Sequence, residues 1–506
     1  MKKTFIKLLL TAIVALIYYY FILPPINVTS MEFWVFLLLM FAIYIGFSLI
    51  YNLSTVSLIK NISGIKNYKL EGFLLLVVIF TLPTIMVVNF FLSPVFNAHS
   101  YASRITINKD TVFTEDVIQV NGSNLPVIDK DSSRKLGDRV MGNMSDLVSQ
   151  FEVSNLYSQI SYKDSIIRVT PLEYSGFIKY LTNKKEGITG FITVNSVTGE
   201  AKLERITKGM QYMDSAYFSK DLKRKLRFSY PTKIFAEMTF ELDDNDNPYW
   251  IIPTIKYSGV NIKADVEGVI ILDPITGSSK YYDVKNVPTW VDHVYPSWLL
   301  LEQTNNWGTY VNGFLNSIFG QKGVVMTSDG YNYTVNNNAT YLYTGITSVA
   351  SDQSNIGFIM INLRTKEANF YSVAGAEEYS AMRSAEGQVQ EKNYNATFPI
   401  LVNINSRPTY FISLKDNAGL VKMYSFVDVV DYQKVVITDA SKGIEEAINN
   451  YSNSVVDTTS TSNNISITVN YIEQVIIDSN TYYYLTDTQN NKYKVNIKVS
   501  SDILPF

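Results

Sequence analysis

The fold is decided by the stretch Gly268-Val-Ile-Ile-Leu-Asp273-Pro-Ile-Thr276-Gly277-Ser278, an apolar run that ends in a polar turn. The chain repeats this pattern at Gly190-Phe-Ile-Thr-Val-Asn195-Ser-Val-Thr198-Gly199-Glu200 and at Gly357-Phe-Ile-Met-Ile-Asn362-Leu-Arg-Thr365-Lys366-Glu367. An Asn or Asp at the head of a turn accepts hydrogen bonds from the backbone ahead of it, and Gly adopts positive φ without strain. Each copy therefore predicts a strand, a turn and the next strand of a hairpin.

A repeat indicates one structural unit used several times, so the three copies predict tandem helix and β-hairpin modules. A related phrase between Pro408 and Lys422 is a candidate for a degenerate fourth copy. None of the copies contains a residue that does chemistry. The repeat therefore favours scaffolding or binding over catalysis.

The helix–strand–strand plan, with a turn of the form valine-aspartate-x-x-threonine-glycine-glutamate between the last two strands, resembles the PepSY module. The resemblance covers about residues 160–285 and 335–435. It implies small α+β units outside a bacterial membrane that bind or inhibit, often acting on peptidases or envelope partners, with no catalytic residues to carry over. The third copy has Lys366 where Gly is expected, so its turn need not share the backbone of the others.

Three apolar stretches precede the repeats, at about Leu8–Leu23, Phe33–Tyr51 and Gly72–Leu92. None contains an ionisable residue, and each is near the length of roughly 17–25 residues that crosses the hydrocarbon of a bilayer. A cleaved signal peptide is the alternative for the first stretch. No small-x-small cleavage site follows it, however, and Pro24 and Pro25 close the helix instead.

The lysines of the short loops predict the orientation of these spans, because Lys and Arg favour the cytoplasmic side. Lys2, Lys3 and Lys7 precede the first span, the loop 24–32 has no Lys or Arg, and the next loop carries Lys60, Lys66 and Lys69. We therefore expect a cell-membrane protein with a cytoplasmic N-terminus and with the residues after about 96 outside the cytoplasm. The spans serve as an anchor or, alternatively, as helical partners in a larger membrane complex.

The composition completes the predicted fold class. The 36 Tyr and 27 Phe of the chain favour sheets. We predict an α+β protein with three N-terminal transmembrane helices, tandem helix/β-hairpin (PepSY-like) modules and a small C-terminal all-β domain. The predicted parts are a three-helix anchor (1–96), a juxtamembrane strand and helix region (97–160), modules with a Trp-rich segment (161–330), further modules (331–455), and a linker with a small β-barrel or meander (456–506).

The composition also excludes several classes of function. The chain has no Cys, which excludes disulfides, thiolate metal sites and Cys nucleophiles. Two histidines cannot form a cluster of His ligands, and a net charge of -3 does not suggest a nucleic-acid surface. The common nucleotide-binding, esterase and metalloprotease motifs are missing. We therefore predict no cofactor, no metal, no nucleic-acid partner and no catalytic residues.

An aromatic segment between the second and third copies is the candidate interaction surface. Tyr and Trp contribute most of the binding energy at many interfaces, and the alternative is an aromatic core between modules. Asp292, His293 and Ser297 lie too close in sequence for a catalytic triad, whose members converge from distant positions. The predicted surface consists of Trp290, His293, Tyr295, Trp298 and Trp307.

Three polar clusters have two interpretations each. Residues 243–247 carry oxygen ligands that suit calcium or form a polar hairpin tip. Glu377, Glu378 and Glu386 provide carboxylates for glycoside hydrolysis or for a solvated helix start. The basic run Lys220–Arg227 contacts lipid phosphates or an anionic wall polymer, or it is a solvated helix face.

The sequence thus predicts an integral membrane protein with a large, non-catalytic binding or scaffold region in bacterial envelope assembly or protein interaction. Its expected partners are the lipid bilayer and a protein partner or envelope polymer. The alternatives are a membrane-tethered peptidase or cell-wall hydrolase with its site in the Trp290–Trp307 segment, and an accessory subunit of a membrane transport or secretion complex.

Overall fold

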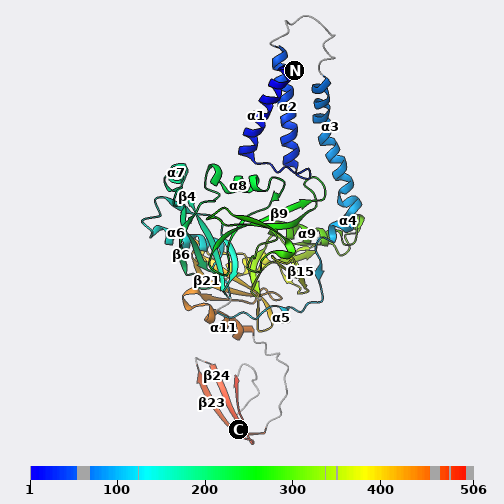
Figure 1. The fold of residues 1–506 in the computed structure, drawn as a ribbon. Coiled ribbons are helices and arrows are strands. Elements are labelled where there is room, and N and C mark those ends of the chain that lie inside the picture. Colours follow the sequence, from blue (N-terminus) through cyan, green and yellow to red (C-terminus); the bar gives the residue numbers. More distant parts are fainter. Residues whose placement is uncertain are drawn as a thin grey trace. The chain divides into compact units, whose positions relative to one another are not determined.

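The structure of the chain is a computed structural model that describes residues 2–53, 69–122, 125–163, 165–336, 338–348, 351–455, 468–477 and 480–496 (Figure 1). The chain divides into two compact units, Met1–Ile448 and Asn449–Phe506. The first unit contains the apolar helices and the repeats, and the second contains the C-terminal strands. Each unit is described by itself.

The first unit begins with α1 (Lys2–Ile22), α2 (Met31–Leu53) and α3 (Lys69–Leu92). All three helices are long and apolar enough to cross a membrane, which confirms the three predicted stretches. Lys60 and Lys66, on which the predicted orientation partly rests, lie outside the described residues.

A buried polar contact joins the three apolar helices. α1 and α3 begin before the predicted spans and so include Lys7 and Glu71. The Lys7 ammonium lies 2.9 Å from a Glu71 carboxylate oxygen and 2.8 Å from the Ser48 hydroxyl of α2. A charge in an apolar environment is stabilised by an opposite charge and by hydrogen bonds, so this contact fixes the helices relative to one another.

The body of the first unit consists of four blocks, each a helix followed by five strands. Block 1 contains α6 (Lys130–Gly142), β2 (Phe151–Val153), β3 (Ser158–Tyr162), β4 (Ser165–Tyr174), α7 (Phe177–Asn183), β5 (Ile188–Asn195) and β6 (Ala201–Met210). Block 2 contains α8 (Leu222–Ser229), β7 (Ile234–Phe235), β8 (Thr239–Leu242), β9 (Pro248–Tyr257), β10 (Ala264–Leu272) and β11 (Ser279–Asp283).

The other two blocks have the same order of elements. Block 3 contains α9 (Ser297–Tyr310), β12 (Val325–Thr327), β13 (Asn332–Asn336), β14 (Ala339–Ser348), β15 (Ser351–Asn362) and β16 (Ala368–Tyr371). Block 4 contains α10 (Glu378–Gly387), β18 (Asn395–Ala396), β19 (Ile400–Ile404), β20 (Arg407–Lys415), β21 (Val421–Asp428) and β22 (Val435–Asp439).

Shorter elements connect these parts. They are α4 (Pro94–Ala102), β1 (Ile107–Asn108), α5 (Phe113–Asp116), η2 (Phe218–Lys220), η3 (Val284–Asn286), η4 (Asn316–Gly320), β17 (Gly375–Ala376), η5 (Gln390–Lys392), η6 (Ala440–Lys442) and α11 (Ile444–Val455). The strands β1 and β17 join the sheet of block 3.

All four sheets have one topology. In each block the last three strands form an antiparallel meander, and the two short strands both pair with the first strand of that meander. The sheet orders are β6-β5-β4-β2, β11-β10-β9-β7, β16-β15-β14-β12 and β22-β21-β20-β18. In addition, β3 pairs with β4, β8 with β9, β13 with β14, and β19 with β20. The predicted mixed α+β class is therefore confirmed, and the structural repeat has four members.

The three repeated turns make the same hydrogen bonds. The Asn195 side chain accepts from the backbone N–H groups two and three residues ahead, at 2.9 Å each. Asp273 and Asn362 accept in the same pattern. Lys366 has φ +63°, close to the +74° of Gly277. The expectation that Lys366 allows a different backbone is therefore wrong, because the Asn362 contacts hold the turn even with a side chain there.

The fourth copy of the turn lies at Asp428 and not between Pro408 and Lys422. The predicted phrase falls on the β20–β21 hairpin, one hairpin too early. The Asp428 carboxylate accepts from the N–H groups of Val430 and Asp431 at 2.9 Å, as in the other turns. Its closing bond reaches Lys434, so the turn is one residue longer. It also lacks the Thr-Gly pair, which explains why the pattern missed it.

The sheets pack face to face because the middle two are apolar on both sides. Along β9, Trp250 and Ile252 pack in the core shared with block 1, whereas Ile251 and Ile255 pack in the core shared with block 3. Residues alternate between the faces of a strand, so a continuous apolar run produces a sheet buried on both faces. A third core joins blocks 3 and 4.

Contacts between block 4 and the start of block 1 complete a ring of contacts. The Lys415 ammonium pairs with Asp129, which caps the N-terminus of α6, and the Ser413 hydroxyl donates to the Val127 carbonyl at 3.1 Å. The contacts thus run from block 1 to 2, 2 to 3, 3 to 4 and back to 1. The helix α6 spans Lys130–Gly142, with Asp129 as its N-terminal cap and Asn143 as its C-terminal cap.

The second unit contains β23 (Val469–Ile477), β24 (Asn480–Asp487) and β25 (Lys492–Asn496). They form a three-stranded antiparallel meander in the order β23-β24-β25. The predicted linker at 458–462 lies outside the described residues.

Candidate functional site

The candidate site is a cavity of about 620 Å³ in the body of the first unit, and all four blocks contribute to its lining. This volume lies in the range of roughly 300–1,000 Å³ that is typical of small-ligand sites. Block 1 provides β3 and the start of α6, block 2 provides the segment before β8, and the segment leading into α9 provides His293. Blocks 3 and 4 close it with β13 and with β18–β20.

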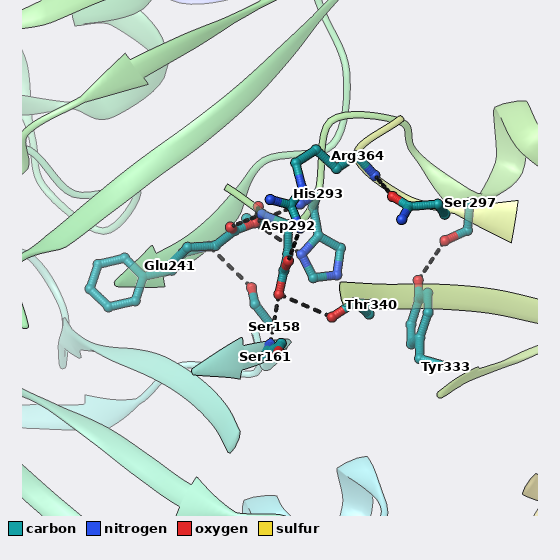
Figure 2. Close-up of polar contacts among 12 residues, drawn as sticks. Ser158, Ser161, Glu241, Asp292, His293, Ser297, Tyr333, Thr340 and Arg364 are labelled. Carbon is teal, nitrogen blue, oxygen red and sulfur yellow. Dashed lines mark hydrogen bonds and ion pairs between the residues drawn. The ribbon is translucent and has the colours of Figure 1, made fainter. Parts of the chain in front are cut away.

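One lining residue, His293, is held from behind by a buried glutamate that does not itself line the cavity. Glu241 in β8 is fully buried, and its Oε1 lies 2.9 Å from Nδ1 of His293, which is 9% exposed (Figure 2). The same carboxylate accepts from the backbone N–H groups of Asp292 and His293, at 2.8 and 3.1 Å, and from the Thr239 hydroxyl at 2.8 Å. Four donors therefore converge on one carboxylate.

Asp292 is held separately from the histidine. Its Oδ2 accepts from the Ser161 N–H at 2.6 Å and from the Thr340 hydroxyl at 3.0 Å, and the Arg364 guanidinium lies 3.8 Å from Oδ1 (Figure 2). These partners come from β3 of block 1 and from block 3. Asp292 therefore ties two blocks together.

The pKa values in this cluster follow from burial and from the neighbouring charges. Burial acts to raise the pKa of Glu241 and to lower that of His293. The hydrogen bond and the charge attraction between the two residues, together with the other hydrogen bonds to Glu241 and the carboxylates near His293, outweigh burial, so the pKa of Glu241 is lowered and that of His293 is raised. Burial and the nearby Glu241 charge raise the pKa of Asp292 to about 6. The structure thus favours a charged His293–Glu241 pair beside a carboxyl group that protonates readily.

Two further polar side chains line the cavity. Gln159 of β3 is buried, and neither its amide oxygen nor its amide nitrogen has a hydrogen-bond partner in the described part of the chain. An unpaired buried amide is costly, so Gln159 is poised to bond a ligand or water. Arg168 of β4 donates to the Ile128 carbonyl, and burial lowers its pKa to about 10.

The named Asp–His–Ser set does not form a triad. The Ser297 hydroxyl is bonded to the Tyr333 hydroxyl at 2.5 Å (Figure 2). His293 contacts Tyr333 edge to face, with 6.0 Å between ring centroids. His293 is therefore a packed, hydrogen-bonded histidine.

The five residues of the predicted interaction surface have different environments. His293 and Tyr295 are buried and line the cavity. Trp290 and Trp307 are half-buried against the core between blocks 2 and 3, where Trp290 packs on Tyr249. Trp298 is exposed. The structure does not gather all five on one exposed surface, because α9 and the segment before it are packed between the sheets.

The other polar clusters have structural positions. Residues 243–247 form the tip of the β8–β9 hairpin, where the Asp243 carboxylate accepts from two backbone N–H groups. Glu377 caps the N-terminus of α10, as a helix start requires. Glu378 is fully buried, so the expectation of a solvated start is wrong for this residue; its carboxylate accepts from Gly345 N and Asn355 Nδ2.

Sequence reasoning missed Glu241, Gln159 and Arg168. Glu241 lies between Phe240 and Leu242 in β8, and Arg168 lies between Ile167 and Val169 in β4. A charge between apolar neighbours in a buried strand requires a partner, and this signal could have identified these two residues. Gln159 lies among serines in β3 and gives no such signal. The pairing of Glu241 with His293 depends on the fold, since 52 residues separate them.

Comparisons with known proteins add little. No protein-family model matches the chain, and no curated protein matches it. Two solved structures, an ACO/RPE65 chimera and an apocarotenoid oxygenase (ACO) of Synechocystis, each share 9% identity at a TM-score of 0.13 and cover 57% of this chain and 49% of their own. The chain thus spans about half the length of these structures, and a likeness this distant carries no argument. The PepSY resemblance and the five-residue surface stay predictions.

Proposed function

We propose that this chain is an integral membrane protein whose four-block body binds a peptide segment of a partner protein in the central cavity, without catalysing a reaction. The observation that supports this most is the lining of the cavity by all four blocks. A site built by every repeat is formed only when the whole body is assembled. The geometry of the cavity therefore depends on the repeated blocks, although the repeated turns themselves contain no catalytic residue.

The lining fits a peptide of little net charge. Three carboxylates (Asp129, Asp131 and Glu237) and three permanent cations (Lys130, Arg168 and Lys415) face or border the cavity, so the lining does not select a strongly charged ligand. The unpaired Gln159 amide offers N–H donors and a carbonyl acceptor, which are the partners that a peptide group needs. The rings of Tyr331, Tyr333 and Phe398 provide apolar contacts for side chains.

The envelope setting rests on the sequence. The lysines around the three helices favour a cytoplasmic N-terminus, which puts the body outside the cytoplasm. The repeated turns resemble those of PepSY modules, which are envelope proteins. A role in binding a partner protein during bacterial envelope assembly is consistent with both this location and the cavity.

The test uses the full-length protein in detergent micelles and synthetic neutral pentapeptides, with muropeptides as a second ligand series. We expect saturable binding of pentapeptides, measured by tryptophan fluorescence, at least about tenfold weaker in Gln159→Ala because a buried hydrogen bond is lost. The control is Gln433→Ala, an exposed glutamine outside the cavity. Equal affinities of the two variants, or binding of muropeptides alone, would refute peptide binding in this cavity.

The His293–Glu241 pair supports a second candidate, a membrane-tethered hydrolase. A protonated histidine held by a buried carboxylate can act as a general acid, and His293 lines the cavity. The same peptide series decides between the candidates by mass spectrometry. Cleavage that disappears in His293→Asn would establish the hydrolase, whereas intact peptides after prolonged incubation support binding alone.

A further inference from the structure

The elements α7, η2 and α8 form one continuous surface of the body. The Tyr180 hydroxyl of α7 donates to the Tyr217 carbonyl at 3.0 Å. The Phe177 ring lies 4.9 Å from that of Tyr217 and 6.1 Å from that of Phe218. η2 leads directly into α8, whose N-terminus is capped by Asp221. We call residues 177–186 and 217–229, which comprise these three elements and the residues next to them, the basic apolar face.

The basic apolar face is fixed to the end of the first membrane-spanning helix. Arg227 donates to the Leu23 carbonyl at 2.9 Å, and Arg224 donates to the Tyr20 carbonyl at 3.2 Å and lies over the Tyr20 ring. Cations are stabilised at the C-terminus of a helix. The ring of Phe228 contacts that of Tyr19 at 5.7 Å. Because the span ends at Ile22, this contact puts α8 at the boundary of the bilayer, and Figure 1 shows α7 and α8 at the end of the body that carries α1.

The exposed side chains of this face are both apolar and cationic. Ile178 is 66% exposed, Phe228 57% and Phe218 53%, and Phe177 is exposed beside them. Residues 177–186 and 217–229 contain eight Lys or Arg and two Asp or Glu; Lys184, Lys185 and Lys223 are exposed, whereas Arg227 is buried. Exposed aromatic and aliphatic residues among lysines are typical of segments that lie in the headgroup layer.

We propose that the basic apolar face is a lipid-contact surface that lies in the headgroup layer of an anionic bilayer. Its lysines contact lipid phosphates, and Phe177, Ile178, Phe218 and Phe228 enter the boundary with the acyl chains. Its continuity with the end of α1 puts the face at this depth, and its charge selects anionic over zwitterionic lipid. This contact orients the body on the membrane. The proposal holds for either side of the membrane, and it does not depend on which ligand the cavity binds.

The test places a single label on the face of the full-length protein. The chain has no native Cys, so Ile178→Cys and, as a control at an exposed residue of the β20–β21 turn, Asn417→Cys each carry one environment-sensitive fluorophore. The proteins are reconstituted in phosphatidylcholine vesicles with or without about one-third phosphatidylglycerol, and with nitroxide-labelled lipid as a quencher. Thermal melting checks that both variants fold like the parent protein.

We expect nitroxide lipid to quench the label at position 178 at least about twofold more than the label at position 417. The difference should increase with phosphatidylglycerol, and should decrease in high salt and in Lys220→Gln/Lys223→Gln, because the attraction is electrostatic. Equal quenching at the two positions would overturn the proposal. Quenching at 178 that is independent of phosphatidylglycerol and salt would overturn the role of the lysines, and protection of this label in detergent would indicate a protein partner instead.

Discussion

Glu241 and Glu378 are both fully buried glutamates, yet the body stabilises them in different ways. Glu241 lies 2.9 Å from the His293 imidazole, and this partner together with the hydrogen bonds from Asp292 and Thr239 outweighs burial and lowers the pKa of Glu241. Glu378 accepts from neutral donors, including Gly345 N at 2.7 Å, and burial raises its pKa. The comparison teaches that, for these two equally buried glutamates, the presence of a cationic partner decides the direction of the pKa shift.

The largest expected effect comes from removing the partner of a buried charge. Glu241→Ala leaves the His293 ring and two backbone N–H groups without their acceptor. Breaking a buried ion pair costs about 3–5 kcal/mol, so we expect a loss of that size in the free energy of unfolding. Urea unfolding of the detergent-purified protein measures it, with Glu378→Ala as the matched variant.

A loss in Glu378→Ala as large as that in Glu241→Ala would contradict the comparison. It would mean that the neutral hydrogen bonds of Glu378 contribute as much as the ion pair of Glu241, and that burial alone sets the cost.

The isosteric variants separate charge from shape. Glu378→Gln preserves the size of a side chain whose raised pKa favours its neutral form, so we expect a change of less than about 1 kcal/mol. Glu241→Gln removes the negative charge beside His293 and should cost about 2 kcal/mol, because His293 then loses its ionic partner. Both variants are measured by urea unfolding at pH 7, and equal losses would show that His293 is not charged in the folded protein.

The two glutamates should affect the pH dependence of stability in opposite directions. The folded pKa of Glu241 is lowered, so its contribution is present above the unfolded pKa and is lost as the pH falls. The folded pKa of Glu378 is raised, so its contribution is complete below the unfolded pKa and is lost as the pH rises through the folded pKa. Between about pH 3 and 6.5, where His293 with its raised pKa stays charged, the two contributions change with opposite slopes.

Unfolding free energies of the parent protein, Glu241→Gln and Glu378→Gln across this pH range test the signs. The unfolding free energy of the parent protein minus that of Glu241→Gln should increase with pH. The corresponding difference for Glu378→Gln should decrease with pH. The sign of each slope is the result that is read out. Slopes of the same sign would show that the two environments are alike.

The sequence predicts the parts of this fold that rest on local patterns. The length of the apolar stretches predicts the three long helices. The turn-forming side chains of Asn195, Asp273 and Asn362 predict three of the four hairpins. The fourth turn was misplaced because Asp428 keeps the side-chain contacts without the Thr-Gly pair. The cavity could not be predicted, since its lining comes from residues as far apart as Gln159 and Lys415. Local periodicity does not determine which sheet packs on which.

The smallest expected effect tests whether a cationic partner also matters at a partly exposed position. Lys366 lies in the third turn at φ +63°, and its ammonium is 2.9 Å from the Asp265 carboxylate of block 2. Lys366→Gly removes a backbone strain of about 1 kcal/mol and an ion pair worth up to about 1 kcal/mol, so we expect a net change below about 1 kcal/mol. Lys366→Met keeps the strained backbone and removes only the charge, so thermal unfolding should show it to be the less stable of the two variants. If Lys366→Gly were the less stable variant, the ion pair with Asp265 would not be the main contribution of Lys366 to the stability of the protein. Stabilisation of carboxylates by a cationic partner would then be confined to the buried cluster around His293.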